Sequence, residues 1–400
     1  MLQGKTIILG VTGSIAAYKS ANLASMLVKQ HAKVRVLMTK NAMNFIHPTT
    51  FESLTGNKCV VDTFDRNFSF DIKHISMAKE ADLVLIAPAS ANIIGKLACG
   101  IADDMLTTTI MACTCPVLVA PAMNVHMYQN AIVQDNMRRL EKFGYRMIEP
   151  AVGRLACGDI GAGKMPEEKE LLEQVLLEAA CPKDLKGLNV LVTAGPTQEV
   201  MDPVRYLTNH SSGKMGYALA RAAARRGANV TLVSGPVGLS CPASVKRFSV
   251  QSAQEMFEEV VKHAPGQDII IKAAAVSDYR PKQVSEEKIK KQDGDFTLEL
   301  VRNPDILKYL GEHRGKGQFL CGFSMETQNM LENSRKKLQT KKIDMIAANN
   351  LKQDGAGFAG DTNILTLIMP ETERSLECMS KDAAAMEILD EIQRQRKERE

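Results

Sequence analysis

The sequence lacks three patterns that would take it out of the class of ordinary globular enzymes. Its nine cysteines include no Cys-x-x-Cys pair, so neither a disulfide framework nor a zinc site with the usual ligand spacing is indicated. The net charge is only +4, without a basic stripe, which excludes a nucleic-acid surface. The apolar run after Asp82 is broken by Ser90, Asn92 and Lys96 and is too short and too polar to span a bilayer. With no secretory signal visible, we expect a cytoplasmic protein with reduced thiols.

Length and composition favour two folded domains. Four hundred residues correspond to about two domains of roughly 150–200 residues each. Short apolar runs alternate with amphipathic stretches, which predicts an α/β fold of two Rossmann-like domains with mainly parallel sheets. The segment Cys181–Asp184 is polar and contains a proline, so we expect domains at residues 1–181 and 186–400.

The same pattern of strand, turn and helix opens both halves, and we interpret it as convergence rather than a true repeat. In the first half we expect strands at Thr6–Val11, Val34–Met38, Leu83–Ala87 and Val117–Ala120, and helices at Ile15–Lys29, Ile93–Cys99, Met105–Cys113, Val125–Phe143 and Glu167–Ala180. In the second half we expect strands at Asn189–Thr193, Asn229–Val233, Asp268–Lys272, Phe296–Val301, Gln318–Phe323, Met345–Ala348 and Ile364–Ile368, and helices at Lys214–Arg226, Ala253–His263, Pro304–His313, Thr327–Lys341 and Lys381–Arg396.

A small-residue turn follows the first predicted strand. Gly10-Val-Thr-Gly13-Ser14 ends a buried strand and opens a helix, where Gly13 permits a tight turn and Ser14 can cap the helix. The free N–H groups at such a helix start suit a phosphate. The spacing is not Gly-x-Gly-x-x-Gly, so a dinucleotide is not indicated, and a plain strand–helix connection remains an alternative.

Two Pro-Ala turns follow adjacent predicted strands. They are Pro88-Ala-Ser90-Ala-Asn92 and Pro121-Ala-Met-Asn124. Open α/β sheets bind ligands at the carboxyl ends of their strands, so these polar side chains are candidates for one site. The alternative is that Ser90, Asn92 and Asn124 only cap helices.

With these turns in view, the first half resembles the flavin-containing cysteine decarboxylases, and phosphopantothenoylcysteine decarboxylase in particular. The matching strings are Lys73-His74-Ile75 with Asp82, the two Pro-Ala turns, and Ala156-Cys157-Gly158-Asp159 through Met165. The resemblance implies an FMN-dependent decarboxylase over residues 1–181, with the FMN phosphate near Gly13 and Ser14. It also implies flavin contacts from Thr39, Ser90 and Asn92, and a homo-oligomer whose flavin site is shared between subunits near Asp103 and Asp104.

The resemblance also assigns roles in the reaction. FMN supplies the redox chemistry that lets a peptide-like cysteine lose CO₂. His74 assists thiol oxidation and positions the substrate, Asn124 holds the carboxylate, and Cys157 donates a proton in the reduction step. The glycine-rich segment around Cys157 is expected to be a polar loop that closes over an intermediate.

The second half contains a helix start that superficially suggests a P-loop. Met215 stands where Ser or Thr is needed and Thr208 where the first Gly is needed, so we reject that interpretation. Small residues and polar N–H groups before Lys214 can still bind a phosphate at the start of an Ala-rich helix.

Residues 185–395 resemble phosphopantothenate–cysteine ligase. The matching strings are Thr193-Ala-Gly-Pro-Thr, Asp202 through Gly216, Lys272-Ala-Ala-Ala-Val-Ser-Asp278-Tyr-Arg-Pro281 and Lys288-Ile-Lys-Lys291. By this resemblance Asn209 positions an acyl intermediate and Lys288 faces the triphosphate of CTP. The further CTP contacts it implies are Lys272, Ala273, Ala274, Asp278, Pro304, Asp305, Ile306, Leu307, Phe323, Lys337 and Lys341. A solvated helix face remains the alternative for Lys337 and Lys341.

Together the two resemblances imply a bacterial fusion enzyme of coenzyme A biosynthesis. It would join 4′-phosphopantothenate to cysteine through an acyl-cytidylate, with Mg²⁺ accompanying CTP. It would then decarboxylate 4′-phosphopantothenoylcysteine to 4′-phosphopantetheine with FMN. The alternatives are a non-catalytic flavoprotein that acts as a regulatory subunit, and an unrelated FMN-dependent decarboxylase or prenyl-transfer enzyme.

Overall fold

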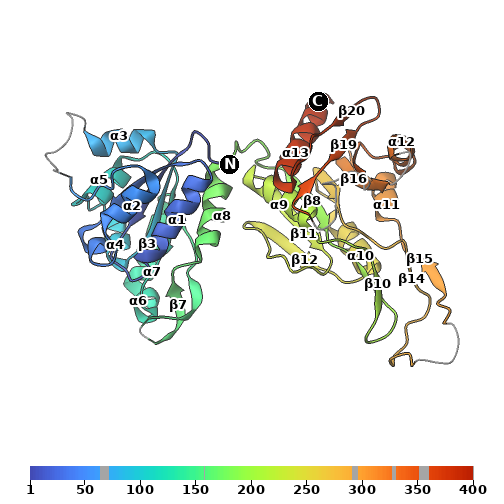
Figure 1. Cartoon of the computed structure of the whole chain (residues 1–400), viewed down its shortest axis with the longest axis horizontal. Helices are drawn as coiled ribbons and strands as arrows, with labels where there is room; N and C mark the ends of the chain where they lie inside the picture. Colours follow the sequence, from blue (N-terminus) through green and yellow to red (C-terminus); the bar gives the residue numbers. More distant parts are fainter. Residues whose placement is uncertain (64–71, 157, 291–295, 327–329, 351–359, 400) are drawn as a thin grey trace. The chain divides into compact units, whose positions relative to one another are not determined.

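The chain forms two compact units, each built on its own parallel sheet (Figure 1). The computed structural model describes residues 1–63, 72–156, 158–290, 296–326, 330–350 and 360–399. One unit comprises Met1–Pro182 and the other Lys183–Glu400.

The first unit has a five-stranded sheet in the order β2-β1-β3-β4-β5. All four pairings are parallel, with Ile8 aligned to Arg35 on one side and Val84 on the other. β1, β3 and β4 are buried at every position, which is the reason they are nearly continuous apolar runs in the sequence. The strands are β1 (Thr6–Val11), β2 (Lys33–Met38), β3 (Leu83–Ala89), β4 (Val117–Pro121) and β5 (Arg146–Met147).

Helices cover both faces of this sheet, so the unit has two apolar cores. Ile7 and Leu9 face one core, whereas Ile8 between them faces the other, as the alternation of a strand requires. The first core contains α1 (Ala17–Lys29), α2 (Pro48–Thr55) and α8 (Glu168–Ala179). The second contains α3 (Lys73–Glu80), α4 (Ala91–Cys99), α5 (Met105–Ala112) and α7 (Ala131–Lys142).

Two predictions about this unit are wrong in detail. The helix expected at Val125–Phe143 is split into α6 (Val125–Gln129) and α7, because Asn130 leaves the helical conformation and its side chain accepts from the Ile132 N–H at 2.9 Å. The glycine-rich segment expected to be a loop is largely an antiparallel hairpin of β6 (Ala151–Arg154) and β7 (Ile160–Lys164). Its small residues allow close packing against the turn after β4. A Cβ on Gly163, whose φ is +132°, would lie 2.4 Å from the Met123 carbonyl oxygen.

The second unit has an eight-stranded sheet in the order β12-β11-β8-β13-β16-β17-β19-β20. The pairings from β12 to β17 are parallel, and β19 and β20 are added antiparallel, so β12 and β20 form the two edges. The strands are β8 (Asn189–Ala194), β11 (Asn229–Ser234), β12 (Val245–Ser249), β13 (Ile269–Lys272), β16 (Phe319–Glu326), β17 (Met345–Asn350), β19 (Leu365–Ile368) and β20 (Glu373–Ser375).

Helices cover both faces of this sheet too. α9 (Lys214–Arg225) packs on β8 and β11 and against α13 (Lys381–Lys397). The other face carries α10 (Ala253–His263), α11 (Ile306–Glu312) and α12 (Met330–Lys341), whose apolar side chains join Leu191, Ile270 and Leu320 in one core.

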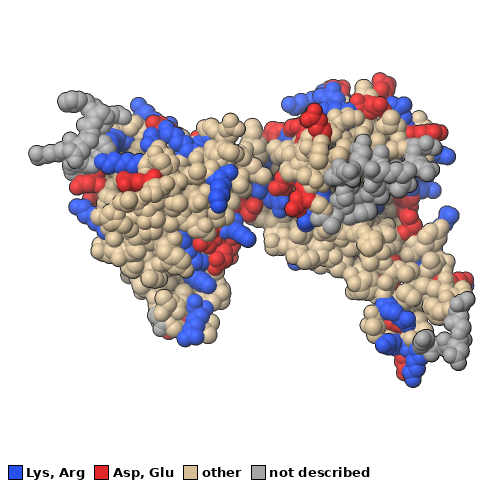
Figure 2. All heavy atoms as spheres, in the orientation of Figure 1, with Lys and Arg blue, Asp and Glu red and all other residues tan. Residues whose placement is uncertain are grey.

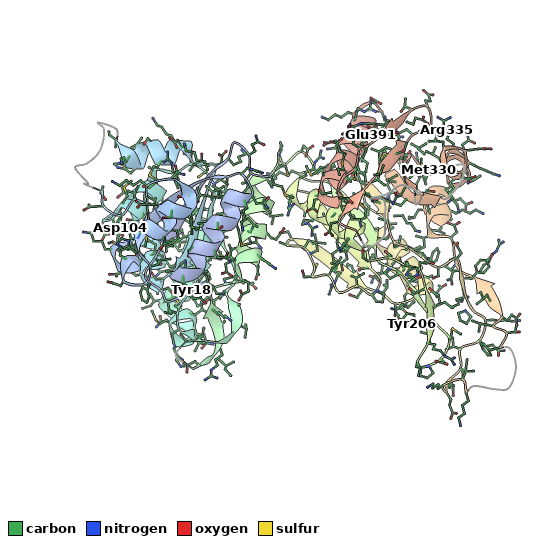
Figure 3. All side chains as sticks on the ribbon, in the orientation of Figure 1. Tyr18, Asp104, Tyr206, Met330, Arg335 and Glu391 are labelled. Atoms are coloured by element: carbon green, nitrogen blue, oxygen red, sulfur yellow. The ribbon has the colours of Figure 1, made fainter. Side chains whose placement is uncertain are left out.

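Short two-stranded sheets complete the second unit. The strand expected at Phe296–Val301 begins later, as β15 (Leu300–Arg302), because it pairs with the three-residue β14 (Tyr279–Pro281) instead of joining the large sheet. β9 (Gln198–Val200) pairs with β10 (Tyr206–Thr208), which carries the exposed Tyr206 labelled in Figure 3, and β18 (Thr362–Asn363) pairs with β21 (Met379–Ser380).

The surface carries charges of both signs. Figure 2 shows basic and acidic side chains interspersed on the visible face of each unit. Within the described part of the chain, no helix is both long enough and apolar enough to cross a membrane.

Candidate active sites

The first unit contains a cavity of about 460 Å³ at the carboxyl ends of β1, β3 and β4. Four of the predicted residues line it together: Gly13, Ser14, Ser90 and Asn124. The hairpin β6–β7 closes one side with Arg154 and Lys164, and Tyr18, labelled in Figure 3, lines it from an exposed position on α1. The strand-end turns therefore lie together along one cavity.

A buried threonine holds the first two turns together. The Thr12 hydroxyl donates to the Pro88 carbonyl at 2.7 Å and accepts from the Ser90 N–H at 3.0 Å. Ser14 accepts from the Ala16 N–H at 3.3 Å just before α1 begins. Gly13 is needed because a Cβ there would lie 2.8 Å from the Asn41 Cβ. The start of α1 thus borders the cavity, and a helix N-terminus in this position suits the phosphate of a flavin nucleotide.

The turn after β4 is tied to the hairpin. The Met123 N–H donates to the Gly163 carbonyl at 3.0 Å, and the Asn124 amide donates to the Asp159 carboxylate at 2.9 Å. Asn124 also caps α6 by accepting from the His126 N–H at 2.8 Å. Asn124 therefore both caps α6 and lines the cavity.

The cavity also has cationic side chains that sequence reasoning missed. Lys19 lines it with its side chain largely buried, and its ammonium lies 2.9 Å from Glu167. This ion pair lowers the pKa of the Glu167 carboxyl. The sequence gave no distinct signal for it, because a lysine in the first turn of α1 is also typical of a solvated helix face.

Other predicted residues lie outside the described lining of this cavity. Thr39 caps the 3₁₀ helix η1 (Lys40–Asn44), whose Asn41 touches Gly13, and Asn92 is exposed on the first turn of α4. His74 is half-buried on α3, which packs against α5. Cys157 falls outside the described residues, although Ala156 before it lines the cavity.

Asp103 and Asp104 have local partners. The Lys96 ammonium lies 2.7 Å from Asp103 and 3.2 Å from Asp104, and Asp104, labelled in Figure 3, caps α5 in a reciprocal arrangement with Thr107. These contacts fix the chain between α4 and α5.

The second unit has a cavity of about 500 Å³ where the carboxyl ends of β13 and β17 and Phe323 of β16 meet the start of α9. Its lining contains Asn209, Lys272, Ala273, Ala274, Asp278 and Phe323, all of which the sequence predicted. Gly213 precedes α9 with a φ of +73°, where a Cβ would lie 2.8 Å from Val237.

Two buried threonines explain the Thr193-Ala-Gly-Pro-Thr197 string. Thr193 Oγ1 accepts from the Ala274 N–H at 3.1 Å, and Thr197 Oγ1 accepts from the Ser277 N–H at 3.0 Å. They fix the loop after β13. Asn209 lies against the same loop, where its amide nitrogen donates to the carbonyls of Val276 at 3.1 Å and Ala275 at 3.4 Å.

Lysines surround this cavity. Burial, with a smaller contribution from Lys341 and Lys337, lowers the pKa of Lys272 to about 8 against the opposing attraction of Asp278. Lys341 pairs with Asp305 at the start of α11, next to Pro304, Ile306 and Leu307, and Lys337 lies 3.4 Å from the Ser324 hydroxyl. Lys288 is exposed and is not in the described lining; the Ile289 N–H beside it donates to Asp202 at 3.2 Å.

Lys214 and Lys381 line the same cavity and were not predicted as site residues. Each is the first residue of its helix, α9 or α13, where the helix dipole disfavours a cation. A lysine at the first position of a helix is therefore a sequence feature that indicates an anion site. Burial and the charge of Lys214 lower the pKa of Lys381.

Two family models match the chain, and they define its class. The model described as Flavoprotein matches residues 1–179, and the model described as DNA/pantothenate metabolism flavoprotein C-terminal domain matches residues 185–395. The molecule is thus a flavoprotein domain fused to a pantothenate-metabolism domain.

Relatives of full length specify the family. The coenzyme A biosynthesis bifunctional protein CoaBC of Bacillus subtilis (strain 168) is 49% identical over 398 residues, covering 98% of this chain and 97% of that protein. The Escherichia coli (strain K12) protein of that name is 43% identical over 394 residues, with coverage of 98% and 97%. A crystal structure of the C-terminal domain of CoaBC, 43% identical, covers 54% of this chain and 99% of its own, with a TM-score of 0.47. The chain belongs to the CoaBC family, and the resemblance drawn from its motifs is confirmed.

Proposed function

We propose that this chain catalyses two consecutive steps of coenzyme A biosynthesis in its two units. The second unit joins 4′-phosphopantothenate to cysteine with CTP, and the first decarboxylates the product to 4′-phosphopantetheine. The observation that carries the proposal is the pair of separate cavities, each at the carboxyl edge of its own parallel sheet and each within one of the two matched regions. The presence of both sites favours an enzyme over a regulatory flavoprotein.

The residues of the first cavity fit a flavin mononucleotide. The helix start at Gly13 and Ser14 would hold the phosphate, with Ser90 on the lining and Thr39 and Asn92 on the adjoining segments. Apolar side chains of the same lining, Met123, Met127 and Met165, would contact the ring system. FMN, when bound, supplies a two-electron acceptor and donor.

The protein groups of this cavity then have distinct tasks. Asn124, a neutral amide held by Asp159, orients the substrate carboxylate without stabilising it so strongly that CO₂ loss is opposed. Lys19, Arg154 and Lys164 attract the anionic substrate. Cys157, next to Ala156 on the lining, donates the proton in the reduction step.

His74 acts, on this proposal, in the cavity of a neighbouring copy. It lies on α3, outside the described lining of its own chain's cavity, while the proposed chemistry needs a histidine beside the thiol. A homo-oligomer with a shared flavin site meets this need.

In the second cavity, the start of α9 and the lysines bind the triphosphate. Lys272 lies in the cavity, and Lys337 and Lys341 are close enough to influence its pKa. Lys288, exposed on the segment beside Asp202, would contact the triphosphate from outside the described lining. The described residues include no cluster of three or more potential metal ligands, so Mg²⁺ would be carried mainly by the phosphates. Asn209, which follows β10, positions the acyl group from its place against the loop after β13.

A coupled assay tests the proposal. The full chain, with phosphopantothenate, cysteine, CTP and Mg²⁺, is expected to release pyrophosphate and CO₂ in equal amounts. Leaving out CTP should abolish both products, and a chelator should abolish pyrophosphate release. Pyrophosphate without CO₂ would contradict the assignment of the first unit. Loss of nucleotide chemistry with CTP, ATP, GTP and UTP alike would contradict that of the second.

A further inference from the structure

Lys272 occupies a special place in the second unit. It is the last residue of β13, the strand between β8 and β16, and it follows three buried isoleucines. The strand thus ends by presenting an ammonium group to the cavity that also contains Asn209 and Asp278. The amine at this point is half-buried, and it shares the cavity lining with Asn209, the residue proposed to position the acyl group.

The carboxylates near Lys272 do not fully compensate the positive charge of its ammonium group. Among the described residues Lys272 forms no ion pair, whereas Lys341 is paired with Asp305. The charges that face it are Asp278 on the loop after β13, and Lys337 and Lys341 on α12. Lys214, Lys381 and His210 also line the cavity, and all but Asp278 are cationic or can become so. Burial, together with the charges of Lys341 and Lys337, lowers the pKa of Lys272 to about 8. The ammonium and the free amine therefore coexist near neutral pH.

The second half of the proposed ligase reaction needs a proton acceptor. Cysteine enters with a protonated amine, which cannot attack the acyl-cytidylate. One proton must leave the ammonium before the nitrogen bonds to the acyl carbon. The bond between that carbon and the phosphate oxygen then breaks, CMP leaves with the electron pair, and the second N–H proton passes to water.

We propose that Lys272 is the base that accepts the first proton from the ammonium of cysteine. The inference rests on the ligase function proposed above and deepens it, because it assigns an acid–base task to a side chain otherwise read as a phosphate contact. While the triphosphate is bound, its negative charge keeps Lys272 protonated. When pyrophosphate leaves, most of that charge leaves with it, and the lysine cluster drives the proton from Lys272 to solvent. The free amine is thus produced at the step that uses it.

Lys272→Arg separates this task from phosphate binding, because arginine keeps the charge but does not release its proton. In single-turnover experiments the variant should form acyl-cytidylate and pyrophosphate within about threefold of the wild-type rate. Amide formation with cysteine should be slower by about 10²-fold, the usual contribution of a general base. Lys336→Arg, an exposed change on α12, is the matched control and should alter neither step.

Hydroxylamine provides the decisive comparison, since it is unprotonated at neutral pH and needs no base. Lys272→Arg and Lys272→Gln should both react with hydroxylamine at rates near that of the wild type once acyl-cytidylate has formed. In the wild type the cysteine step should show an inflection near pH 8, where Lys272 loses its proton. Both variants should lack that inflection, and their rates should follow only the ionisation of cysteine's own ammonium.

Equal slowing with cysteine and hydroxylamine, or an unchanged pH profile in the variants, would overturn the role of Lys272. Failure of the wild type to release pyrophosphate would instead overturn the proposed ligase function, so the two failures are distinguishable.

Discussion

The Asn124 amide nitrogen lies 2.9 Å from an Asp159 carboxylate oxygen and joins the turn after β4 to the segment between β6 and β7. The pair crosses the region where Ala156 and Asn124 line the first cavity. It therefore ties Asn124, the amide proposed to hold the substrate carboxylate, to Asp159 in the segment between β6 and β7.

Reversing this pair tests its geometry. Asn124→Asp places two carboxylates in contact, so the hairpin should be pushed away and CO₂ release should fall about 10²-fold or more. The double variant Asn124→Asp with Asp159→Asn restores a donor and an acceptor. It should recover the flavin absorbance spectrum and flavin affinity of the wild type, with only part of the decarboxylase rate because the neutral amide has moved. If the double variant binds flavin no better than the single one, the pair does not hold the hairpin.

Cys157→Ser is expected to stop decarboxylation late. A hydroxyl is a far weaker acid than a thiol, so the final protonation should slow by about 10²-fold or more while CO₂ loss continues. Mass spectrometry should show the oxidised, decarboxylated enethiol accumulating. A normal yield of 4′-phosphopantetheine would remove Cys157 from the mechanism, and Cys181→Ser near the end of the first unit is the control thiol.

The two activities should separate between Cys181 and Leu185. Each unit has its own sheet and its own apolar cores, so residues 1–181 expressed alone should fold, bind FMN and decarboxylate added 4′-phosphopantothenoylcysteine. Circular dichroism and the flavin spectrum are the measurements. A folded fragment that takes up no flavin would show that the division is misplaced.

Asn209→Asp should block the ligase between its half-reactions. The amide donates to the carbonyls of Val276 and Ala275, whereas an ionised carboxylate cannot donate to them or to an acyl carbonyl and repels the negative charge that develops there. Amide formation should slow by about 10²–10³-fold, whereas pyrophosphate release should persist, because the lysines around the triphosphate are unchanged. Quenched-flow mass spectrometry should detect the stalled acyl-cytidylate. Wild-type turnover would refute this role, and Asn229→Asp, at the exposed first residue of β11, is the matched control.

The elements buried in the sheets were predictable, because burial on both faces leaves a continuous apolar run. The strand Thr6–Val11 was predicted to the residue, and so was the helix Ala253–His263. The three-residue strands β9, β10 and β14 were not, since each is short and only partly buried and pairs with one other short strand outside the large sheet.

The residues of the candidate sites were likewise predictable only in part. Polar residues directly after buried strands were expected to gather and do, as Ser90 and Asn124 show. Lys19 reaches its site from a helix, where a single lysine does not stand out from a solvated face. His74 and Lys288 were predicted only through resemblance, and the described lining of each cavity does not include them. A residue supplied by a second copy or by a separate loop leaves no trace in the periodicity of its own segment.

The two edges of the eight-stranded sheet have a consequence for how this chain behaves among its copies. All three residues of β20 are exposed, with Glu373 2.8 Å from Arg335 of α12, and β12 carries exposed Lys246 and Arg247. Another strand that tried to extend the sheet at either edge would have to desolvate these charges or break the ion pair. The edges are therefore protected against indiscriminate aggregation, even though the row of backbone groups there is open to pairing.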